Sequence, residues 1–526
     1  MKASQYIMIA VLLFLLAAPI PTILLLGKRP VTGTFLTWMA NRTLTGITIP
    51  RQDVAISMKA WLDGSFQQSA QQWANENFAG RELAIRWFNQ ILWSLFGKSY
   101  MNLEHPIAGG EGQLFASQYL EHFGRLSAPR SDGALNRATA DITRLRTRLQ
   151  KYDVPLVVLF TPSKPFSVPE DVPARYIPKQ TPASIPYERD RLKMRLLAAG
   201  IPVVDGAELT RGLGDRLPLP PFPKTGIHWT DLAASYSAEA LLRKFEILGG
   251  RPLARLEVSD VQFAESPRDS DSDVLELLNL ALPRFDHYAY GKVSRNPMIP
   301  SRQGRLVMVG GSILFSLTRI WEQSEVWREI EHFNYSFRLI HYPGGFATPL
   351  DLATVDWVQT IGNADAAVVE MNEELIGPVY LTRFIAAAIG GLPETPPPMM
   401  AAFPESQWYD SESDSIHHWH WSKGDADLLL HRTLDAPFRL KAAVKASRLS
   451  GTLRILGPDG SVIWKGLVGS DRLTSVRTEA FWLKESRGTL RLESDVIPGK
   501  PSFNGDPRLL GFGLWDLSFE EDEAKP

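Results

Sequence analysis

The chain has 526 residues, of which 44% are apolar, so it is long enough to form more than one domain with an ordinary hydrophobic core. Its formal net charge of −2 argues against a nucleic-acid-binding protein, because contacts with phosphates require a basic face. The sequence contains no cysteine, which excludes thiol catalysis, disulfide bonds and cysteine-ligated zinc.

The first predicted element is an apolar run over residues 7–26. A helix rises about 1.5 Å per residue, so this run can cross a hydrocarbon core of about 30 Å. Lys28 and Arg29 close the run, which favours an uncleaved anchor over a cleaved signal peptide. We therefore expect residues 1–30 to be an N-terminal membrane anchor or signal, containing a transmembrane helix. In residues 31–104, apolar positions at helical intervals predict a membrane-proximal helical segment.

Residues 105–392 show helical patterns that alternate with short, nearly continuous apolar runs. The predicted strands are residues 155–160, 201–205, 305–309, 337–342 and 366–371. The predicted helices are residues 135–149, 187–199 and 231–245. Buried strands between helices are typical of a parallel sheet that is covered on both faces. This part of the sequence therefore predicts an α/β fold with a mostly parallel sheet flanked by helices.

The composition changes at residues 393–415, where prolines in a polar and acidic stretch indicate a linker. Residues 416–526 contain short strand-like runs, with a hairpin-type turn at Pro458-Asp459-Gly460. This spacing of strands and turns predicts a C-terminal all-β sandwich.

The predicted sandwich opens with His417-His418-Trp419-His420-Trp421. In an extended strand, His418 and His420 share one face, but no additional ligand is evident and we predict no metal site. Trp419 and Trp421 share the opposite face, where their flat rings are candidate sugar-binding surfaces of a carbohydrate-binding-module-like domain. The alternative is that they pack in the core of the sandwich.

A candidate nucleophile follows the predicted strand at residues 305–309. Gly310, Gly311 and Ser312 come at its carboxyl end, where the sites of open α/β sheets form. His228 is the candidate base, because imidazole titrates near neutrality and accepts the proton of a serine hydroxyl. The two glycines permit close approach of backbone to substrate, and the Ser312 amide is a candidate oxyanion donor. The alternatives are that Ser312 caps a helix and that His228 is an ordinary hydrogen-bonded histidine.

Five short stretches resemble the motifs of a known family and occur in the expected order. Residues 77–81 read Asn-Phe-Ala-Gly-Arg, and residues 109–115 read Gly-Gly-Glu-Gly-Gln-Leu-Phe. Residues 160–164 read Phe-Thr-Pro-Ser-Lys. The last two stretches are His-Trp-Thr at residues 228–230 and Gly-Gly-Ser at residues 310–312. Through these stretches the chain resembles the SGNH-hydrolase-like proteins of the AlgX/AlgJ type, which are periplasmic proteins of alginate and related exopolysaccharide O-acetylation. The resemblance extends from Trp73 to Glu373.

The resemblance implies an extracytoplasmic O-acetyltransferase. His228 would deprotonate Ser312, Ser312 would take an acetyl group from a donor, and a hydroxyl of the polysaccharide acceptor would then attack the acyl-serine. Lys164 and Gly311 would take part in substrate binding, and no metal or organic cofactor would be needed. A multi-pass membrane O-acyltransferase would supply the acetyl group. The implied location is the periplasm, with the protein anchored to the bacterial inner membrane by its N-terminal helix.

Two positions depart from the family pattern. Gly226 stands where the family's Asp-x-His motif has an aspartate. Gly311 stands where the family's Gly-Asp-Ser motif has an aspartate. A carboxylate beside the catalytic histidine fixes its tautomer and stabilises the imidazolium, so its loss costs rate. Asp231 is our candidate orienting carboxylate, although its position also fits the first turn of a capped helix. Asp205, at the end of a predicted strand, is another candidate.

These departures keep two other functions open. One is a polysaccharide acetylesterase or deacetylase, which would use the same serine with water as the acceptor. The other is a catalytically silent polysaccharide-binding subunit of an acetylation or secretion complex.

The acidic run at residues 269–273 lacks the glycine and the distal glutamate of a calcium loop, and it predicts a solvated turn.

Overall fold

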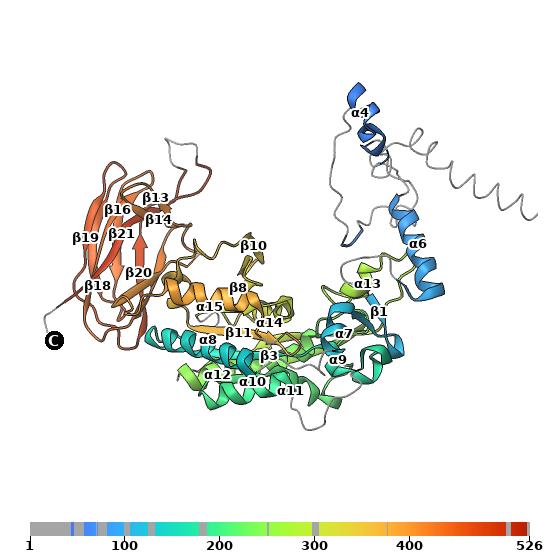
Figure 1. The fold of residues 1–526 in the computed structure, drawn as a ribbon. Coiled ribbons are helices and arrows are strands. Elements are labelled where there is room, and N and C mark those ends of the chain that lie inside the picture. The colour runs from blue at the N-terminus through green and yellow to red at the C-terminus, as the bar shows by residue number, and fades with distance from the viewer. Residues whose placement is uncertain are drawn as a thin grey trace, which may run out of the picture.

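The computed structural model describes residues 44–46, 57–69, 71, 81–98, 106–124, 132–177, 187–249, 252–296, 304–375, 377–404, 406–500 and 506–522. The anchor expected at residues 1–30 lies outside these ranges. Inside them, none of the helices combines the length and the apolar content needed to cross a membrane. Figure 1 shows an α/β domain in the middle, a β-rich domain at one end, and the helices α4 (Met58–Leu62) and α6 (Arg81–Phe96) at the other.

The α/β domain is built on a mixed sheet whose described strands follow the order β10, β9, β8, β7, β11, β3, β4. Their bounds are β3 (Leu156–Thr161), β4 (Val203–Asp205), β7 (Arg305–Gly310), β8 (Glu329–Asn334), β9 (Arg338–Tyr342), β10 (Phe346–Pro349) and β11 (Ala366–Asn372). Neighbouring strands from β8 to β4 run parallel, whereas β9 and β10 form an antiparallel edge.

The prediction of a mostly parallel sheet therefore needs a correction. The central sheet is mixed, and the other sheets among the described residues are antiparallel, so sheets in this chain are not mainly parallel. The reason is the tight turn between β8 and β9. Such a turn reverses the direction of the chain, whereas parallel neighbours require a long crossover.

Helices cover both faces of the central sheet. On one face lie α8 (Asp132–Lys151), α10 (Glu188–Ala198) and α15 (Val379–Gly391), and on the other lie α12 (Asp231–Gly249) and α14 (Phe315–Ser324). Successive residues of β3 enter opposite cores: Val158 packs with the first group of helices and Val157 with the second. This burial on both faces explains why β3 is a continuous apolar run. The predicted helices at 135–149, 187–199 and 231–245 are confirmed as α8, α10 and α12.

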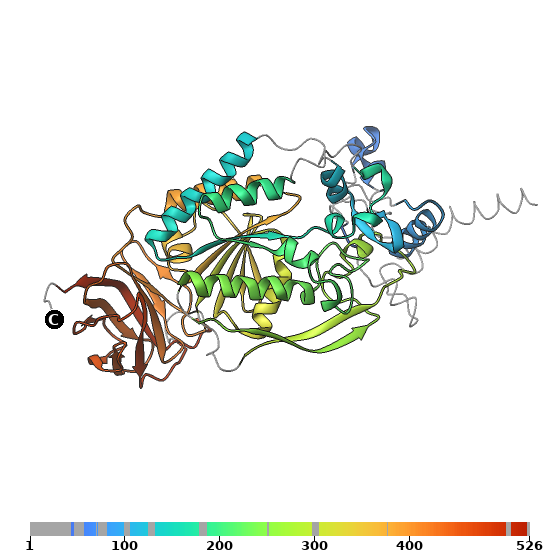
Figure 2. The same ribbon diagram turned by 90° about the horizontal axis from the view of Figure 1, so that it is seen from below.

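A ribbon outside the central sheet carries a short helix that matters for the site. β5 (Leu256–Ala264) pairs antiparallel with β6 (Tyr288–Arg295), and Figure 2 shows this ribbon running beside the α/β core. α13 (Asp273–Leu277) lies in the connection between the two strands. The remaining short elements of the domain are β1 (Pro106–Ala108), β2 (Leu114–Ala116), α7 (Ser117–Gly124), α9 (Lys164–Ser167) and α11 (Gly206–Arg211).

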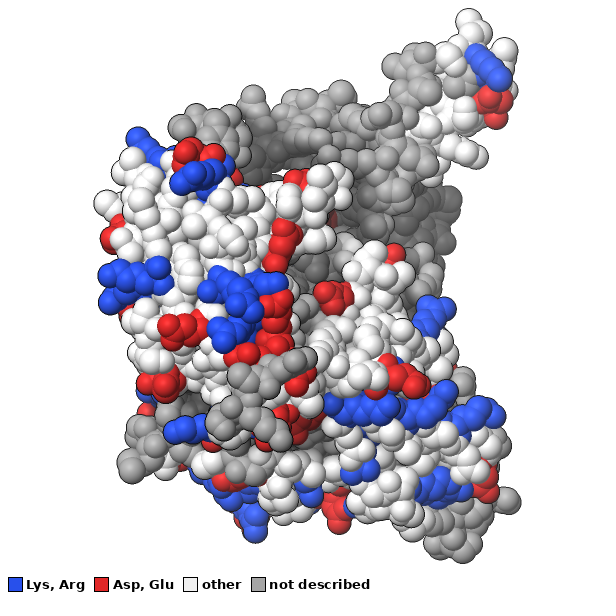
Figure 3. Space-filling view, turned by 90° about the vertical axis from the view of Figure 1, so that its left-hand side faces the viewer, with Lys and Arg blue, Asp and Glu red and all other residues white. Residues whose placement is uncertain are grey.

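The C-terminal domain is a sandwich of two antiparallel sheets. One contains β12 (Met399–Ala402), β15 (Ala426–Arg432), β20 (Arg487–Ser494), β17 (Gly451–Leu456) and β18 (Val462–Val468). The other contains β13 (Glu412–Ser413), β14 (His418–Trp421), β21 (Phe512–Glu521), β16 (Phe438–Ala446) and β19 (Thr474–Arg477). In the face seen in Figure 3, Lys and Arg lie interspersed with Asp and Glu, so neither sign of charge dominates it.

The segment predicted as a linker is partly structured. Residues 399–402 form β12 and pair with β15, so the sandwich begins before residue 416. Its junction with the α/β domain includes an ion pair of 3.2 Å between Arg487 and Asp365, and a hydrogen bond of 2.8 Å from Ser486 Oγ to Asp153 Oδ2. The linker was predicted because this stretch contains several prolines. Prolines exclude a helix, but they are compatible with an edge strand such as β12.

Candidate active site

Ser312 lies where the sequence predicted it, directly after the carboxyl end of β7. It begins the short helical turn Ser312–Leu314 that leads into α14. Gly310 has no room for a side chain, because a Cβ there would lie 2.6 Å from Glu370 Oε2. The strand can therefore pass close to its neighbour β11 and present Ser312 at the edge of the sheet.

His228 contacts Ser312 directly. Its Nε2 lies 2.9 Å from Ser312 Oγ, and its side chain is 11% exposed. The neighbouring residue fixes this loop, because Trp229 is buried and donates from Nε1 to the carbonyl of Ile313 at 3.0 Å. The predicted pair of base and nucleophile is thus brought together in the structure.

The carboxylate beside His228 belongs to Asp273, the first residue of α13. Its Oδ2 lies 2.6 Å from His228 Nδ1. Its Oδ1 accepts hydrogen bonds from the amides of Ile227 at 3.0 Å and Val274 at 2.8 Å, which fix the orientation of the carboxylate. Ser312, His228 and Asp273 thus form a chain of contacts with the geometry of a catalytic triad.

Asp231 does not occupy this position, which corrects the sequence-based choice. It begins α12 and forms an ion pair with Arg319 at 2.7 Å. Asp205, the second candidate, caps α11 and pairs with Lys193 at 2.8 Å. The acidic run at residues 269–273 is likewise more than a solvated turn, since it supplies the carboxylate at the site.

Gly226 explains how Asp273 reaches the histidine. A Cβ at this position would lie 2.7 Å from the carbonyl oxygens of Ser270 and Asp271. The backbone of the acidic run therefore packs against a residue that has no side chain. The position that lacks the family's aspartate is the one that admits the segment carrying a substitute.

Tyr335 is a residue of this site that sequence reasoning missed. Its hydroxyl lies 3.1 Å from Ser312 Oγ and accepts a hydrogen bond of 3.1 Å from the Ser312 amide. Tyr335 and Ser336 both have a positive φ, of 49° and 57°, in the turn between β8 and β9. Such strain in residues other than glycine costs on the order of 1–3 kcal/mol each and is concentrated at functional sites. The tyrosine ring also lies 3.1 Å from where a Cβ of Gly311 would be, so the second departure from the family pattern leaves room for it.

Glu370 holds the backbone beneath the nucleophile. Its Oε2 accepts from the Gly311 amide at 2.9 Å, and its Oε1 accepts from Thr161 Oγ1 at 2.5 Å. Burial raises the pKa of Glu370 to about 7. The amide of Gly311, a residue expected to take part in substrate binding, is therefore engaged by a buried carboxyl group, and the amide beside Ser312 Oγ is that of Ser312 itself.

Lys164 has a structural position rather than the expected place at the substrate. It is 1% exposed, and its Nζ donates over 2.7–2.9 Å to four backbone carbonyls, those of Leu114, Pro223, Lys224 and Gly226. Burial lowers its pKa to about 7, yet all four partners are acceptors, and an ammonium group carries three donors and no acceptor. Lys164 thereby ties the loop before His228 to β2.

We expect Lys164→Met to lower the free energy of unfolding by about 3 kcal/mol, because it leaves buried carbonyls without donors. Urea denaturation measures this change. Lys151→Met, at an exposed residue that ends α8, is the matched control and should change stability by less than about 0.5 kcal/mol. Equal midpoints for the two variants would show that the loop holds its shape without the ammonium group.

Trp419 and Trp421 lie in one aromatic cluster, which belongs to the sandwich. Trp419 stacks on Trp515 with ring centroids 5.8 Å apart, and Trp421 meets Trp515 edge-on at 5.1 Å. Gly513 makes space for them, since a Cβ there would lie 2.3 Å from the Trp515 ring. Trp421 is only 9% exposed, so Trp419 offers the more accessible of the two predicted rings.

Residues 107–290 match a family model described as the SGNH hydrolase-like domain of the acetyltransferase AlgX, a range that includes His228 and Asp273 and ends before Ser312. None of the curated proteins matches the sequence.

Solved structures from three bacteria are similar to parts of the chain. The O-acetyltransferase domain of Pseudomonas putida AlgJ is 17% identical and covers 54% of this chain and 98% of its own, with a TM-score of 0.33. Pseudomonas aeruginosa AlgX is 14% identical and covers 80% and 94%, with a TM-score of 0.36. Bacillus cereus PatB1 is 9% identical and covers 48% and 93%, with a TM-score of 0.32. At the level of sequence, residues 107–290 of the chain are thus similar to the SGNH hydrolase-like domain of the acetyltransferase AlgX.

Proposed function

We propose that this protein is an O-acetyltransferase that transfers acetyl groups to hydroxyls of an exopolysaccharide through an acyl-Ser312 intermediate. The observation that carries the proposal is the chain of contacts from Asp273 through His228 to Ser312 Oγ. It occurs in a chain whose matched domain is of the AlgX acetyltransferase type. The alternative of a catalytically silent polysaccharide-binding subunit was favoured by the missing aspartate of Asp-x-His. Asp273 supplies a carboxylate beside His228, so this argument for the alternative no longer applies.

The first half-reaction forms the acyl-enzyme. His228 Nε2 takes the proton of Ser312 Oγ while the oxygen attacks the carbonyl carbon of the acetyl donor. Asp273 accepts the hydrogen bond of Nδ1–H, which selects the tautomer with a free Nε2 and stabilises the imidazolium. The tetrahedral intermediate then collapses, and the imidazolium returns the proton to the departing group of the donor.

The negative charge of the tetrahedral intermediate requires hydrogen-bond donors. Two lie beside Ser312 Oγ: its own amide and the Tyr335 hydroxyl, since the Gly311 amide is engaged by Glu370. In the free protein the Tyr335 oxygen lies against both Ser312 N and Oγ. The acetyl oxygen displaces it from the amide and then accepts a hydrogen bond from the hydroxyl.

The second half-reaction transfers the acetyl group. A polysaccharide hydroxyl gives its proton to His228 Nε2 and attacks the acyl carbon, and collapse of this second tetrahedral intermediate releases the acetyl ester and restores Ser312. In this proposal the sandwich binds the polymer, with Trp419 as one contact. A multi-pass membrane O-acyltransferase supplies the acetyl group on the periplasmic side of the inner membrane, where residues 1–30 anchor the chain.

Transfer and hydrolysis are distinguished by one experiment. The protein is incubated with an activated acetyl ester and an oligosaccharide, and acetylated sugar and free acetate are quantified by mass spectrometry. We expect an adduct of one acetyl group on Ser312 and more acetylated sugar than acetate. An adduct that yields only acetate in the presence of sugar would instead identify an acetylesterase.

We expect Tyr335→Phe to lower kcat for acetyl-ester cleavage by about 10²-fold, because it removes one donor to the developing oxyanion. KM should change little, since the interaction forms in the transition state. Tyr236→Phe, at an exposed tyrosine on α12, is the matched control and should leave both constants unchanged. A faster Tyr335→Phe enzyme would mean that the hydroxyl only blocks the site.

A further inference from the structure

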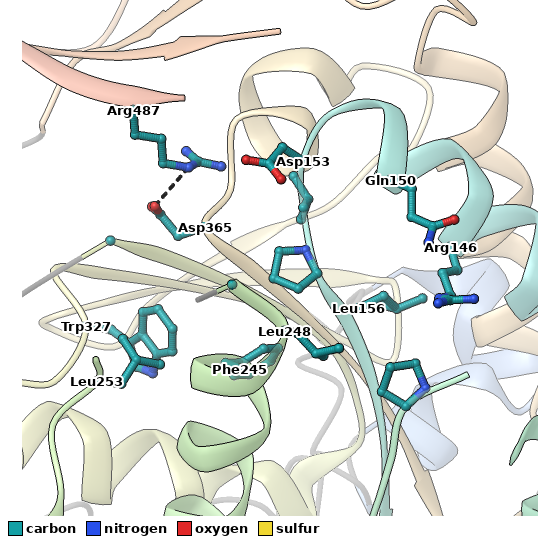
Figure 4. Close-up of a pocket in the computed structure, with 15 residues that line it drawn as sticks. Arg146, Gln150, Asp153, Leu156, Phe245, Leu248, Leu253, Trp327, Asp365 and Arg487 are labelled. Atoms are coloured by element: carbon teal, nitrogen blue, oxygen red, sulfur yellow. Dashed lines mark ion pairs between the residues drawn. The ribbon is translucent and has the colours of Figure 1, made fainter. Parts of the chain in front are cut away.

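A cavity of about 290 Å³ lies at the edge of the central sheet opposite Ser312, where the sandwich meets the α/β domain (Figure 4). Its lining includes Leu156 and Gly304, at the amino ends of β3 and β7, and Arg487 from β20 of the sandwich. Ser312 follows the carboxyl end of β7. The cavity is therefore separate from the proposed catalytic site.

Two carboxylates of the cavity are already engaged. Asp365 pairs with Arg487 and accepts a hydrogen bond of 2.7 Å from the amide of Arg305. Asp153 accepts from Ser486 at 2.8 Å. These contacts join the two domains, and they leave little capacity in the cavity for binding a cation.

Three hydrogen-bond donors of the cavity differ from the two carboxylates, because they lack partners among the described residues. Arg146 and Gln150 lie one turn apart on α8, and Figure 4 shows both on the wall opposite Arg487. Within the part of the chain that the structure describes, no hydrogen bond or ion pair holds the side chain of the half-buried Arg146 or of the exposed Gln150. The buried Nε1–H of Trp327 has no partner there either. The unused hydrogen-bonding capacity is mainly that of donors, one of which is positively charged. Such a site suits a ligand rich in acceptors with a negative charge.

The rest of the wall is apolar. Phe245, Leu248 and Leu253 lie beside Trp327 below the polar groups in Figure 4. Apolar and aromatic walls with a few convergent polar groups are typical of ligand pockets, and this volume lies just below their usual range of about 300–1,000 Å³. A ring with an apolar face and a carboxylate at its edge fits both the size and the chemistry.

We propose that this junction cavity binds an acidic saccharide, with Arg146 pairing with the carboxylate of a uronate-type sugar. The polymer class rests on the proposed function, whereas the location and the charge preference come from the cavity itself. The occupied cavity joins α8 of the α/β domain to β20 of the sandwich through one ligand. A polymer held there raises the effective concentration of its other sugars near the protein, where Ser312 can acetylate them.

The chain has no cysteine, so a single one can report on the cavity. We place it with Ile247→Cys in the full-length protein, at a residue of α12 that is 76% exposed and adjoins Leu248. An environment-sensitive fluorophore on this cysteine is titrated with a glucuronic acid trisaccharide, a neutral glucose trisaccharide and inorganic phosphate. Arg146→Ala is compared with Arg144→Ala, which removes an arginine of the same helix that is 68% exposed and paired with Asp141.

We expect saturable binding of the acidic trisaccharide, weakened about tenfold or more by Arg146→Ala and unchanged by Arg144→Ala. Equal weakening by both variants, an equal response to the neutral trisaccharide, or no binding at millimolar concentration would overturn the proposal. Displacement by an equal concentration of phosphate would identify a simple anion site and overturn the saccharide assignment. Ser312→Ala should bind the trisaccharide normally, so a failure of the catalytic proposal is recognised separately from a failure of this one.

Discussion

Replacement of Ser312 by alanine is expected to lower the rate of acetyl-ester cleavage by about 10⁴-fold or more, because no other group takes over the attack on the carbonyl carbon. His228→Ala should have an effect of similar size, since the serine hydroxyl is a poor nucleophile without a base. Release of p-nitrophenolate from p-nitrophenyl acetate measures both. The effects of replacing residues that act as one unit are strongly non-additive. The Ser312→Ala/His228→Ala double variant should therefore be no slower than either single variant.

The matched control for the serine is Ser316→Ala, four residues further along the chain. Ser316 Oγ donates to the carbonyl of Trp229 at 3.2 Å, so its loss affects packing but not the nucleophile. Its rate should stay within about twofold of the native rate. Similar rates for the native protein and Ser312→Ala, with both proteins folded by circular dichroism, would remove the enzyme assignment and make a binding subunit the leading alternative.

Asp273→Asn is expected to lower kcat by about 10³- to 10⁴-fold, although the side chain keeps its shape. An amide that donates its N–H toward His228 Nδ1 favours the tautomer whose Nε2 is protonated, and that nitrogen then cannot accept the proton of Ser312. The reaction should recover part of its rate as pH increases, because hydroxide replaces the missing base. The measurement is the pH dependence of kcat for p-nitrophenyl acetate.

Asp231→Asn is the informative comparison, because it was the carboxylate chosen from sequence. Asp231 pairs with Arg319 at the start of α12, so its replacement should cost about 1 kcal/mol of stability and leave kcat within a few-fold of native. The opposite ranking of the two variants would contradict the assignment of Asp273.

The sequence was sufficient for the parts of the site that depend on regular structure. The apolar run before Gly310 predicted β7 and with it the place of Ser312, because a buried strand needs continuous apolar residues. The position of His228 before the helical pattern that begins at Asp231 was equally local. The strand prediction depended on the apolar pattern, which a single sequence displays, whereas His228 was chosen for the chemistry of imidazole and for the His-Trp-Thr stretch that resembles the family.

Asp273 and Tyr335 could not be found in that way. Asp273 lies 45 residues from His228, and its selection depends on which loop packs against Gly226. Tyr335 follows β8, a strand that the sequence does not reveal, because Glu331 and His332 make it look polar although both are buried. The signals that exist are the two glycines at positions where the family has aspartate. A lost side chain marks a place where something else approaches, but only the fold shows what it is.

The order of the three residues along the chain has a wider consequence. Here the histidine comes first, the acid second and the serine last, with the acid in a connection of the β5–β6 ribbon outside the central sheet. A motif search that requires Asp-x-His and Gly-Asp-Ser would discard this chain as a degenerate relative. Catalytic geometry constrains where the carboxylate oxygen lies and not which segment delivers it. Relatives that look inactive by their motifs are therefore worth testing for an acid placed at the histidine by an unrelated loop.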